Sequence, residues 1–372
     1  MSGDLVALKN VLVHGGNVHA AARDLRRPID SILDFSASIN PLGPSPQVIR
    51  ALVAAAPLIK HYPDPDCFSL KQVIARHWKI SPDCLVIGNG SSELIDVIPR
   101  ALGIRSALIV GPTYGEYARA VDRSGGRYQM VLASRNDVYR PPLEQVTHRL
   151  QGQRSGPRAI DAVFICHPNS PTGRACDLQQ LDDLFQAAKR GRIWVVLDES
   201  FIDYCDALTC VPRLQAYPRL IILRSFTKFY GMPGLRIGYS MSSRSAAAIL
   251  KEHQPPWSVN TVAQRAAEAA VADQRHARRC LAYVGRERAR MSKQLAALAG
   301  LTVIPSSANF VFAELPPSCG AGLITAALRQ RGMLIRDCSS VEGCGPRSIR
   351  MAVRTKVDND SLLAALAQVL ER

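Results

Sequence analysis

Apolar and polar positions alternate along the chain in two distinct ways, and the change between them outlines the fold. Between Pro46 and Ser242, short continuous runs of Val, Ile and Leu are separated by segments with amphipathic, helical spacing. Continuous apolar runs are typical of parallel strands that helices cover on both faces. We therefore expect an α/β domain with a mostly parallel sheet. The predicted strands span residues 106–110, 128–133, 162–168, 193–200, 220–226 and 236–241.

The two ends of the chain have a different pattern. The first 45 residues lack a regular apolar period and are predicted to form an arm. After Ser243 come longer helical patterns at 259–272 and 276–299, then strand-like runs around a helix near 320–331. Such a mixture favours a smaller α+β domain. The predicted organisation is an N-terminal arm that packs with the small domain (1–45), a large domain (46–242) and a small C-terminal domain (243–372).

The composition agrees with a folded protein of two domains. A chain of 372 residues can bury a large core, and 47% apolar with 21% charged residues argues against disorder. The ten cysteines form no CxxC pair and no metal-like spacing with histidine, so we expect reduced thiols, a cytoplasmic location and no metal site. The first residues do not resemble a signal peptide, and no apolar run reaches the roughly 18 residues of a membrane span. We expect no membrane partner.

The formal net charge of +15 is the one unusual bulk property. Such a charge suits nucleic acids, acidic surfaces or phosphorylated ligands. The basic residues are dispersed, with only short clusters at Arg23–Arg27 and Arg275–Arg279, which favours a solvated basic surface. A DNA-binding regulator would need a recognition domain ahead of the catalytic fold, and no helix-turn-helix fits in the 45 residues that precede it. We expect a small phosphorylated substrate as the partner and no nucleic acid.

Ligands of parallel sheets gather where strands end, and three such loops carry unusual residues. "GNGSSELID" is a Gly-rich turn that opens a helix at Ser91 and Ser92, where free N–H groups and the helix dipole favour a phosphate. "HPNSPTG" follows a strand and ends in a turn. "VVLDES" places Asp198 at a strand end, where a carboxylate needs a cation or hydrogen bonds. Each loop alone also fits an ordinary cap or turn.

A fourth loop, "SFTKFYGMPGLRIGY", combines a lysine with hydroxyls and an arginine. Cationic neighbours lower the pKa of Lys228, as an amine nucleophile requires, and the hydroxyls with Arg236 can hold a phosphate dianion. Asp198 would keep a pyridine nitrogen protonated, and Tyr114 is placed to stack on a ring. Together these groups specify pyridoxal 5'-phosphate, carried by Lys228 as a Schiff base. The predicted phosphate ligands are Ser91, Ser92, Ser225, Thr227 and Arg236.

Five motifs in order, "GNGSSELI", "PTYGEY", "PNSPTG", "DESFIDY" and "SFTKFYGMPGLRIGY", resemble the fold-type I class I and II aminotransferase family, which depends on pyridoxal phosphate. Among its members, the histidinol-phosphate aminotransferases are similar to this chain. The resemblance implies that Lys228 and Asp198 are catalytic, and that the protein is a homodimer with active sites at the subunit interface. It also implies that Tyr62, in "HYPDPDC", reaches the cofactor phosphate of the neighbouring subunit.

The arm and the small domain resemble one branch of that family more closely. "HGGNV", "DFSASINPLGP", "PWSVN" and "LIRDC" are similar to the threonine-phosphate decarboxylases of cobalamin biosynthesis. This resemblance implies decarboxylation of L-threonine O-3-phosphate to (R)-1-amino-2-propanol O-2-phosphate. The alternatives are a histidinol-phosphate or related aminotransferase, and a phosphoserine decarboxylase, whose substrate differs by one methyl group.

Two positions depart from the family pattern. Transaminases of the family usually carry a tyrosine three residues after the pyridine-binding aspartate, where this chain has Phe201. Loss of that hydroxyl should change the electronics of the cofactor, which favours the decarboxylase branch, although a neutral exchange is the other interpretation. The family asparagine that bonds the cofactor phenolic oxygen is Ser170 here, preceded by Asn169. Either residue is a candidate for that contact.

Substrate recognition requires one site for a carboxylate and one for a phosphate, and arginine suits both because its fork is bidentate. Arg350 matches the family arginine that binds the substrate carboxylate. Arg336 matches a second arginine for the substrate phosphate. Arg354 would share a strand face with Arg350 by the period of two. The remaining predicted substrate ligands, all in the arm, are His14, Ser36 and Asn40.

Overall fold

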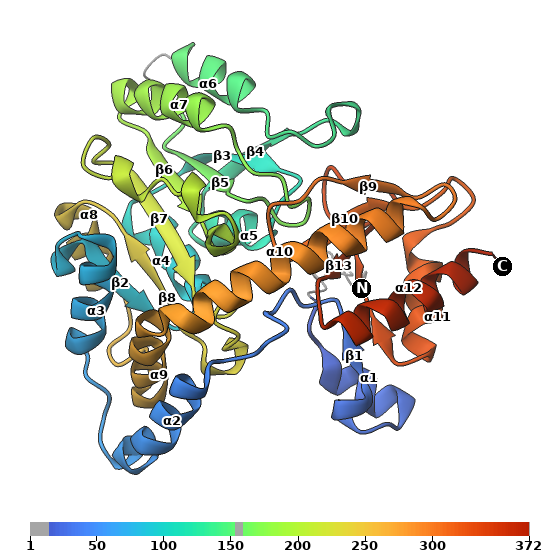
Figure 1. Ribbon diagram of the computed structural model, residues 1–372. Coiled ribbons are helices and arrows are strands. Elements are labelled where there is room, and N and C mark those ends of the chain that lie inside the picture. The colour runs from blue at the N-terminus through green and yellow to red at the C-terminus, as the bar shows by residue number, and fades with distance from the viewer. Residues whose placement is uncertain (1–14, 153–158, 372) are drawn as a thin grey trace, which may run out of the picture.

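A seven-stranded sheet forms the centre of the large domain (Figure 1). The computed structural model describes residues 15–152 and 159–371. The strand order is β2-β8-β7-β6-β5-β3-β4, and only β8 runs antiparallel to its neighbours. The predicted, mostly parallel sheet is therefore confirmed. Its strands are β2 (Leu85–Gly88), β3 (Ser106–Gly111), β4 (Arg127–Leu132), β5 (Ala162–Cys166), β6 (Trp194–Asp198), β7 (Leu220–Ser225) and β8 (Gly238–Met241).

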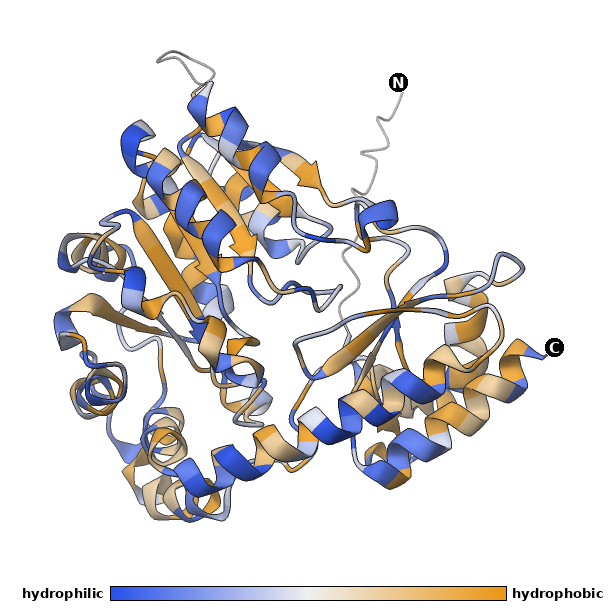
Figure 2. Ribbon diagram, turned by 45° about the horizontal axis from the view of Figure 1, so that its top comes forward, coloured by the Kyte–Doolittle hydropathy of each residue, from blue (hydrophilic) through white to orange (hydrophobic). Residues whose placement is uncertain are grey.

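Helices cover both faces of this sheet, so the central strands are buried throughout. Neighbouring residues of a strand point to opposite faces: Leu108 joins one apolar cluster and Ile109 another. Figure 2 shows the apolar strands between helices whose outer faces are polar. The helices of the large domain are α2 (Pro46–Ala55), α3 (Phe68–Trp78), α4 (Ser91–Ala101), α5 (Glu116–Arg123), α6 (Leu143–Gln151), α7 (Leu178–Gly191), α8 (Arg244–Glu252) and α9 (Thr261–Ala272).

The boundary predicted after Ser242 does not agree with the packing. Helix α8 buries Leu250 in the same cluster as Leu94 of α4. Helix α9 packs on α2 and α3 and buries Ala267 in the large-domain core. Both helices follow the last strand of the sheet in sequence, but their apolar faces complete its covering layers. The large domain therefore continues to about Ala272.

The small domain is an antiparallel sheet of order β12-β13-β10-β9, packed on helices. Its strands are β9 (Thr302–Ile304), β10 (Phe310–Glu314), β12 (Arg336–Asp337) and β13 (Ser348–Ala352). Its helices are α10 (Gln274–Ala296), α11 (Ala321–Gln330) and α12 (Lys356–Leu370). Helix α10 is 23 residues long and runs from the large domain across the small one (Figure 1).

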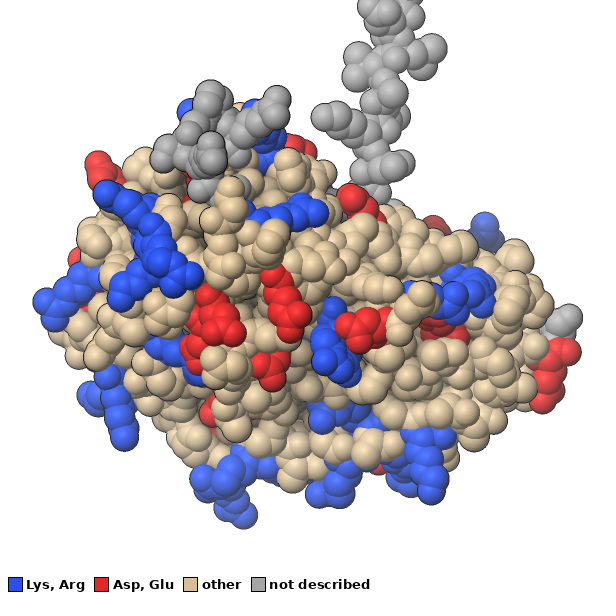
Figure 3. Space-filling model, turned by 90° about the horizontal axis from the view of Figure 1, so that it is seen from above, with Lys and Arg blue, Asp and Glu red and all other residues tan. Residues whose placement is uncertain are grey.

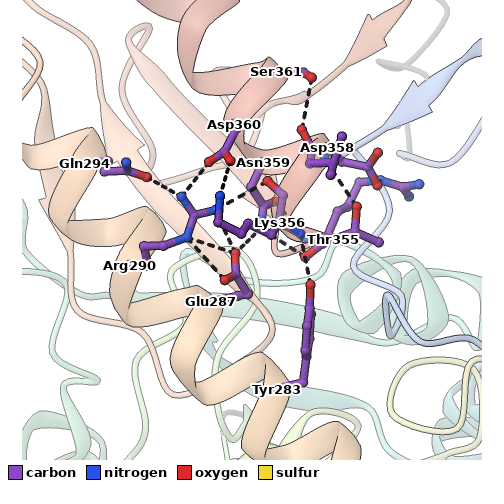
Figure 4. A network of polar contacts seen from close by, with 12 residues as sticks. Tyr283, Glu287, Arg290, Gln294, Thr355, Lys356, Asp358, Asn359, Asp360 and Ser361 are labelled. Carbon is purple, nitrogen blue, oxygen red and sulfur yellow. Dashed lines mark hydrogen bonds and ion pairs between the residues drawn. The ribbon is translucent and has the colours of Figure 1, made fainter.

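A polar network joins α10 to the start of α12 (Figure 4). Arg290 donates to Glu287 at 2.8 Å and to Asp360 at 2.5 Å. Buried Asn359 donates to Glu287 at 3.1 Å and to the Arg354 carbonyl at 3.0 Å. The network fixes the segment that follows β13, because the Arg354 backbone N–H also donates to Asn359.

The N-terminal arm packs with the small domain and then crosses to the large one. It contains α1 (Val18–Leu25) and β1 (Leu33–Asp34), which pairs in parallel with β11 (Met333–Leu334). Farther along, the Asn40 backbone N–H donates to the Lys228 carbonyl at 3.0 Å. Short 3₁₀ turns fill the connections of the chain: η1 (Ile29–Ser31), η2 (Ala56–Lys60), η3 (Pro82–Cys84), η4 (Arg135–Asp137), η5 (Ile202–Tyr204), η6 (Asp206–Leu208), η7 (Val211–Arg213) and η8 (Pro233–Leu235).

Basic side chains are spread over the molecule. On the face seen in Figure 3 they lie in several separate places with acidic side chains between them. Among the described residues, no helix is long and apolar enough to cross a membrane, and no group of three or more His, Cys, Asp and Glu residues could hold a metal ion.

Candidate active site

Parallel strands β5, β6 and β7 bring the predicted catalytic residues together at one edge of the sheet. Asp198, at the end of β6, lies beside Cys166 of β5, and Ser225 ends the next strand. Lys228 follows Ser225 by three residues, so the lysine and the aspartate leave adjacent strands at the same edge. The strand pattern alone therefore predicts that Lys228 and Asp198 lie close together.

The Asp198 carboxylate is buried and held by two donors. The Tyr117 hydroxyl donates to Oδ2 at 2.7 Å, and the Ser200 backbone N–H donates to Oδ1 at 2.9 Å. Burial, together with the Asp198 charge, raises the pKa of Tyr117 well above its usual value, so its hydroxyl stays a donor. An oriented carboxylate of this kind can accept a hydrogen bond from a protonated ring nitrogen.

The Lys228 amine is partly buried among cations and an aromatic ring. Burial lowers the pKa of Lys228 to about 8, and the charges of Arg350 and Arg236 act in the same direction, while Asp198 opposes them. The Lys228 Nζ lies 5.7 Å from the centroid of the Phe201 ring. Near neutral pH a useful fraction of this amine is therefore uncharged and nucleophilic.

Residues from three segments form a cradle that fits a phosphate dianion. The hydroxyls of Ser225 and Thr227 are buried and 2.8 Å apart. Helix α4 begins at Ser91 without a side-chain cap, which leaves N–H groups of its first turn for an anion. A Cβ at Gly90 would lie only 2.6 Å from Arg236 Nη2, so glycine allows the guanidinium to approach the backbone there.

Two further predicted cofactor residues lie next to this cradle. Tyr114 hydrogen-bonds with Ser92, and burial raises the pKa of its hydroxyl. The Tyr114 ring packs edge-on against Tyr117 with centroids 5.7 Å apart. Since Tyr117 touches Asp198, Tyr114 lies between the cradle and the carboxylate. Its stacking on the cofactor ring stays a prediction.

The Arg350 guanidinium projects from β13 into this space without a carboxylate partner among the described residues. It donates from Nη1 to Ser170 Oγ and from Nη2 to the Ser36 carbonyl, both at 2.9 Å, while Nε has no partner in the described parts of the chain. Its Cζ lies 5.1 Å from the centroid of the Phe310 ring. Burial lowers the pKa of Arg350, and the positive charge of Arg336 on the adjacent strand contributes.

The two neighbours in the "HPNSPTG" turn have different partners. The Asn169 amide nitrogen donates to the Pro112 carbonyl and to Thr172 Oγ1, both at 2.8 Å. Ser170 instead accepts from Arg350. Both donor hydrogens of the Asn169 amide are therefore used within the protein, and Ser170 is the one that faces the arginine.

Two predicted substrate ligands of the arm have partners within the protein. Ser36 Oγ accepts from the Gly16 N–H and donates to Asp34, and the Asn40 carboxamide bonds to the Phe229 carbonyl and the Leu42 N–H. These polar groups hold the arm in place, and contact of Ser36 or Asn40 with the substrate stays a prediction. His14 lies outside the described residues.

Arg354 and Tyr62 lie at the ends of two different segments, outside the group of residues around Lys228. Strand β13 ends at Ala352, so the period of two does not extend to Arg354, which forms an ion pair with Asp358 at 3.2 Å. The prediction that Arg354 shares a strand face with Arg350 is therefore wrong. Tyr62 is 81% exposed and packs on Trp257 with ring centroids 4.9 Å apart. Its predicted contact with a second subunit stays a prediction.

The structure adds two residues that the sequence reasoning missed. Tyr117 orients Asp198, and Phe310 lies under Arg350 and packs edge-on on Phe201. Tyr117 lies in the first turn of α5, whereas Tyr114 precedes that helix, so only their closeness along the chain links the two rings. No comparable local signal links Phe310 to Phe201, because they come from different domains.

Known proteins share the sequence pattern and the fold of this chain. The family model "Aminotransferase class I and II" matches residues 30–366. The chain belongs to this family. Its cofactor is pyridoxal phosphate, and the lysine, carboxylate and phosphate cradle described above fit that group.

The chain is similar to proteins of two kinds, threonine-phosphate decarboxylases and histidinol-phosphate aminotransferases. It is 38% identical to the threonine-phosphate decarboxylase of Salmonella typhimurium over 96% of both chains. It is 31% identical to the histidinol-phosphate aminotransferase of Anaeromyxobacter sp. over 92% of both chains. The solved histidinol-phosphate aminotransferase of Sinorhizobium meliloti, in complex with pyridoxal-5'-phosphate, superposes with a TM-score of 0.85 at 27% identity and covers 96% of this chain and 95% of its own.

Proposed function

We propose that this family member decarboxylates L-threonine O-3-phosphate to (R)-1-amino-2-propanol O-2-phosphate, the aminopropanol unit used in cobalamin biosynthesis. The observation that carries the proposal is Arg350, a partly buried guanidinium that lacks a carboxylate partner among the described residues and lies near Lys228. The relative of that name, matched over nearly the whole chain, supports this reaction. The Phe201 position supports it as well.

The cofactor would be held by residues that the fold brings together at the sheet edge. The phosphate would bind at the start of α4, Ser225, Thr227 and Arg236, and Asp198 would accept from the ring nitrogen. Bound pyridoxal phosphate supplies an electron sink for the electron pair that is released when a bond to the substrate Cα breaks.

Arg350 would act before the bond to the carboxylate breaks, and Lys228 would act after it has broken. Arg350 would bind the substrate carboxylate and orient the Cα–carboxylate bond before it breaks. The carboxylate would leave as carbon dioxide, and its electron pair would remain on the cofactor side. Lys228 Nζ, or a water beside it, would return one proton to Cα. Arg336, on the strand next to Arg350, is the proposed ligand of the substrate phosphate, and it has no ion pair within the described parts of the chain.

A histidinol-phosphate aminotransferase is the second candidate, because two relatives with this name are 31% identical over more than nine-tenths of the chain. It uses the same lysine, carboxylate and phosphate cradle but requires a 2-oxo acid as amino acceptor. A phosphoserine decarboxylase is the third, since a single methyl group gives weak discrimination. For each candidate we propose a homodimer whose Tyr62 reaches the cofactor phosphate of the second subunit.

The deciding experiment follows products from the purified, cofactor-loaded protein and L-threonine O-3-phosphate without any oxo acid. We expect release of carbon dioxide and aminopropanol phosphate in equal amounts, with the visible absorbance of the cofactor preserved. Phosphoserine is compared at equal concentration. No release, but turnover of histidinol phosphate once 2-oxoglutarate is added, would contradict the decarboxylase assignment.

A matched pair of variants tests the role of Arg350. Arg350→Gln should lower kcat/KM by at least about 100-fold, because a bidentate charged contact to the carboxylate is lost. The variant should still bind the cofactor to the same extent. Arg354→Gln, on the neighbouring segment but paired with Asp358, should change kcat/KM by less than about threefold.

A further inference from the structure

A cavity of about 150 Å³ lies in the large domain at the edge of the sheet opposite to the catalytic residues. It is bounded by the last turns of α7 and by the beginnings of β6 and β7, where Val195 pairs with Leu220. Asp198 and Ser225 stand at the other ends of these strands. The cavity is therefore separate from the proposed substrate site.

The inner wall of this cavity is apolar. Phe185, Ala188, Ile193 and Leu220 line it, and each is buried. The ring of Tyr217 completes the wall, packed on Phe185 with centroids 5.0 Å apart. A dry cavity of about this size in another protein holds a benzene molecule, so one six-membered ring is the scale of occupant that fits.

The rim of the cavity carries three cations and no acid. Lys189, Arg192 and Arg219 line it, and none of them has an ion pair within the described parts of the chain. Arg219 is held in place by stacking on Trp194, with its Cζ 4.8 Å from the ring centroid. Burial lowers the pKa of Arg219, and the positive charge of Arg192 contributes, as expected for cations gathered without an anion between them.

Helix α7 carries two acids, Asp182 and Asp183, and neither lines the cavity. Asp182 accepts two hydrogen bonds from Arg213, at 2.5 and 2.8 Å. Within the described parts of the chain, none of the three rim cations has an ion-pair partner, and no side chain fills the space beside the apolar wall. A ligand that supplies both an anion and an apolar group would bury a ring in the cavity and place its charge at the rim.

We propose that this cavity binds a small organic anion with a single apolar ring, of the size and charge of an aromatic monocarboxylate. The ring lies against Phe185, Ala188 and Tyr217, and the carboxylate faces Arg219 and Arg192. The site is independent of the proposed reaction, because its residues lie at the opposite edge of the sheet from Lys228.

Benzoate is the probe that tests this site, titrated into the full-length, cofactor-loaded protein by calorimetry or ligand-detected NMR. We expect saturable binding with a Kd on the order of 1 mM, as suits so small a ligand. Benzamide, which has the ring without the charge, and acetate, which has the charge without the ring, should each bind at least about fivefold more weakly. Added salt should weaken benzoate binding.

Four variants locate the binding. Ala188→Leu should abolish it by filling the cavity, and Arg219→Gln should weaken it about fivefold or more, while Arg190→Gln, on the same helix but outside the cavity, should leave it unchanged. Thermal unfolding and cofactor absorbance confirm that each variant is folded. Arg350→Gln separates this cavity from the substrate site and should leave benzoate binding intact. The proposal is overturned by the absence of saturable binding, by binding that survives both cavity variants, or by binding that Arg350→Gln removes.

Discussion

At the scale of single residues, the candidate site depends on the direction in which each polar side chain points. The loop order places Lys228 and Asp198 at adjacent strand ends, and the structure agrees. For Asn169 and Ser170, both polar and adjacent, the sequence could not decide which one turns toward the site. That choice depends on the fold of the turn, which points the Asn169 amide at Pro112 and Ser170 at Arg350.

The lowered pKa of Lys228 predicts how cofactor loading depends on pH. Only the neutral amine attacks the aldehyde, and with a pKa of about 8 its neutral fraction rises through that pH. Between pH 7 and pH 9 the rate of loading of cofactor-free protein should rise about tenfold and then level off. Stopped-flow absorbance after mixing with pyridoxal phosphate measures this rate. A midpoint near 10.5, the ordinary lysine value, would contradict the predicted environment. Lys228→Ala is the control and should show no such phase.

Phe201→Tyr tests whether this position tunes the cofactor. A hydroxyl here should donate to the cofactor phenolic oxygen and compete for the proton that this oxygen shares with the Lys228 nitrogen. We expect the pH midpoint of the visible absorbance change to fall by about one unit, equivalent to one hydrogen bond. Phe201→Leu, which lacks a hydroxyl, separates this effect from loss of the ring. A midpoint equal to that of the unmodified protein would make the phenylalanine a neutral exchange.

At the scale of elements, a buried charge network fixes the two loops that carry the catalytic residues. Arg224 of β7 donates to Glu199 at 3.1 Å and to Asp203 at 2.8 Å, and its guanidinium stacks on Trp78. Although burial alone would lower it, the carboxylates of Asp203 and Glu199 raise the pKa of Arg224 above its usual range. The sequence predicted the strands but not this network, because its members become neighbours only when β6 and β7 pair.

Replacement of Arg224 should therefore destabilise the protein strongly. Arg224→Met leaves two buried carboxylates without a cation, which typically costs about 3–5 kcal/mol of the free energy of unfolding. Arg213→Met is the matched control, since it breaks the more exposed pair with Asp182 and should cost about 1 kcal/mol or less. Equilibrium urea unfolding compares the two. Equal losses would show that the buried network does not carry the predicted stability.

At the scale of the whole molecule, the two-domain organisation follows from the sequence pattern but the domain boundary does not. Strand and helix runs predicted the large sheet and the smaller α+β domain, and both are present. Helices α8 and α9 follow the last strand of the large sheet, so their sequence position suggests the small domain. Only the burial of residues such as Leu250 and Ala267 against α4, α2 and α3 shows where they belong.

Exposed apolar side chains that lie close to Tyr62 in the sequence would suit the interface of the proposed homodimer. Val53, Ile59 and Phe68 are all more than 60% exposed, and they lie in the segment that also contains Tyr62. An apolar surface of this kind is typical of a protein–protein interface. Ile59→Glu would place a charge in that interface, where an unpaired carboxylate is costly.

We therefore expect Ile59→Glu to shift the protein from dimer to monomer in sedimentation velocity at micromolar concentration. Its cofactor affinity should also fall, because a monomer loses the proposed Tyr62 contact to the phosphate. Leu323→Glu is the matched control: Leu323 is 76% exposed, but it lies on α11 of the small domain, away from this surface. Dissociation by Leu323→Glu and not by Ile59→Glu would move the interface to the small domain. A monomeric unmodified protein would remove the subunit contact of Tyr62 from the proposed site altogether.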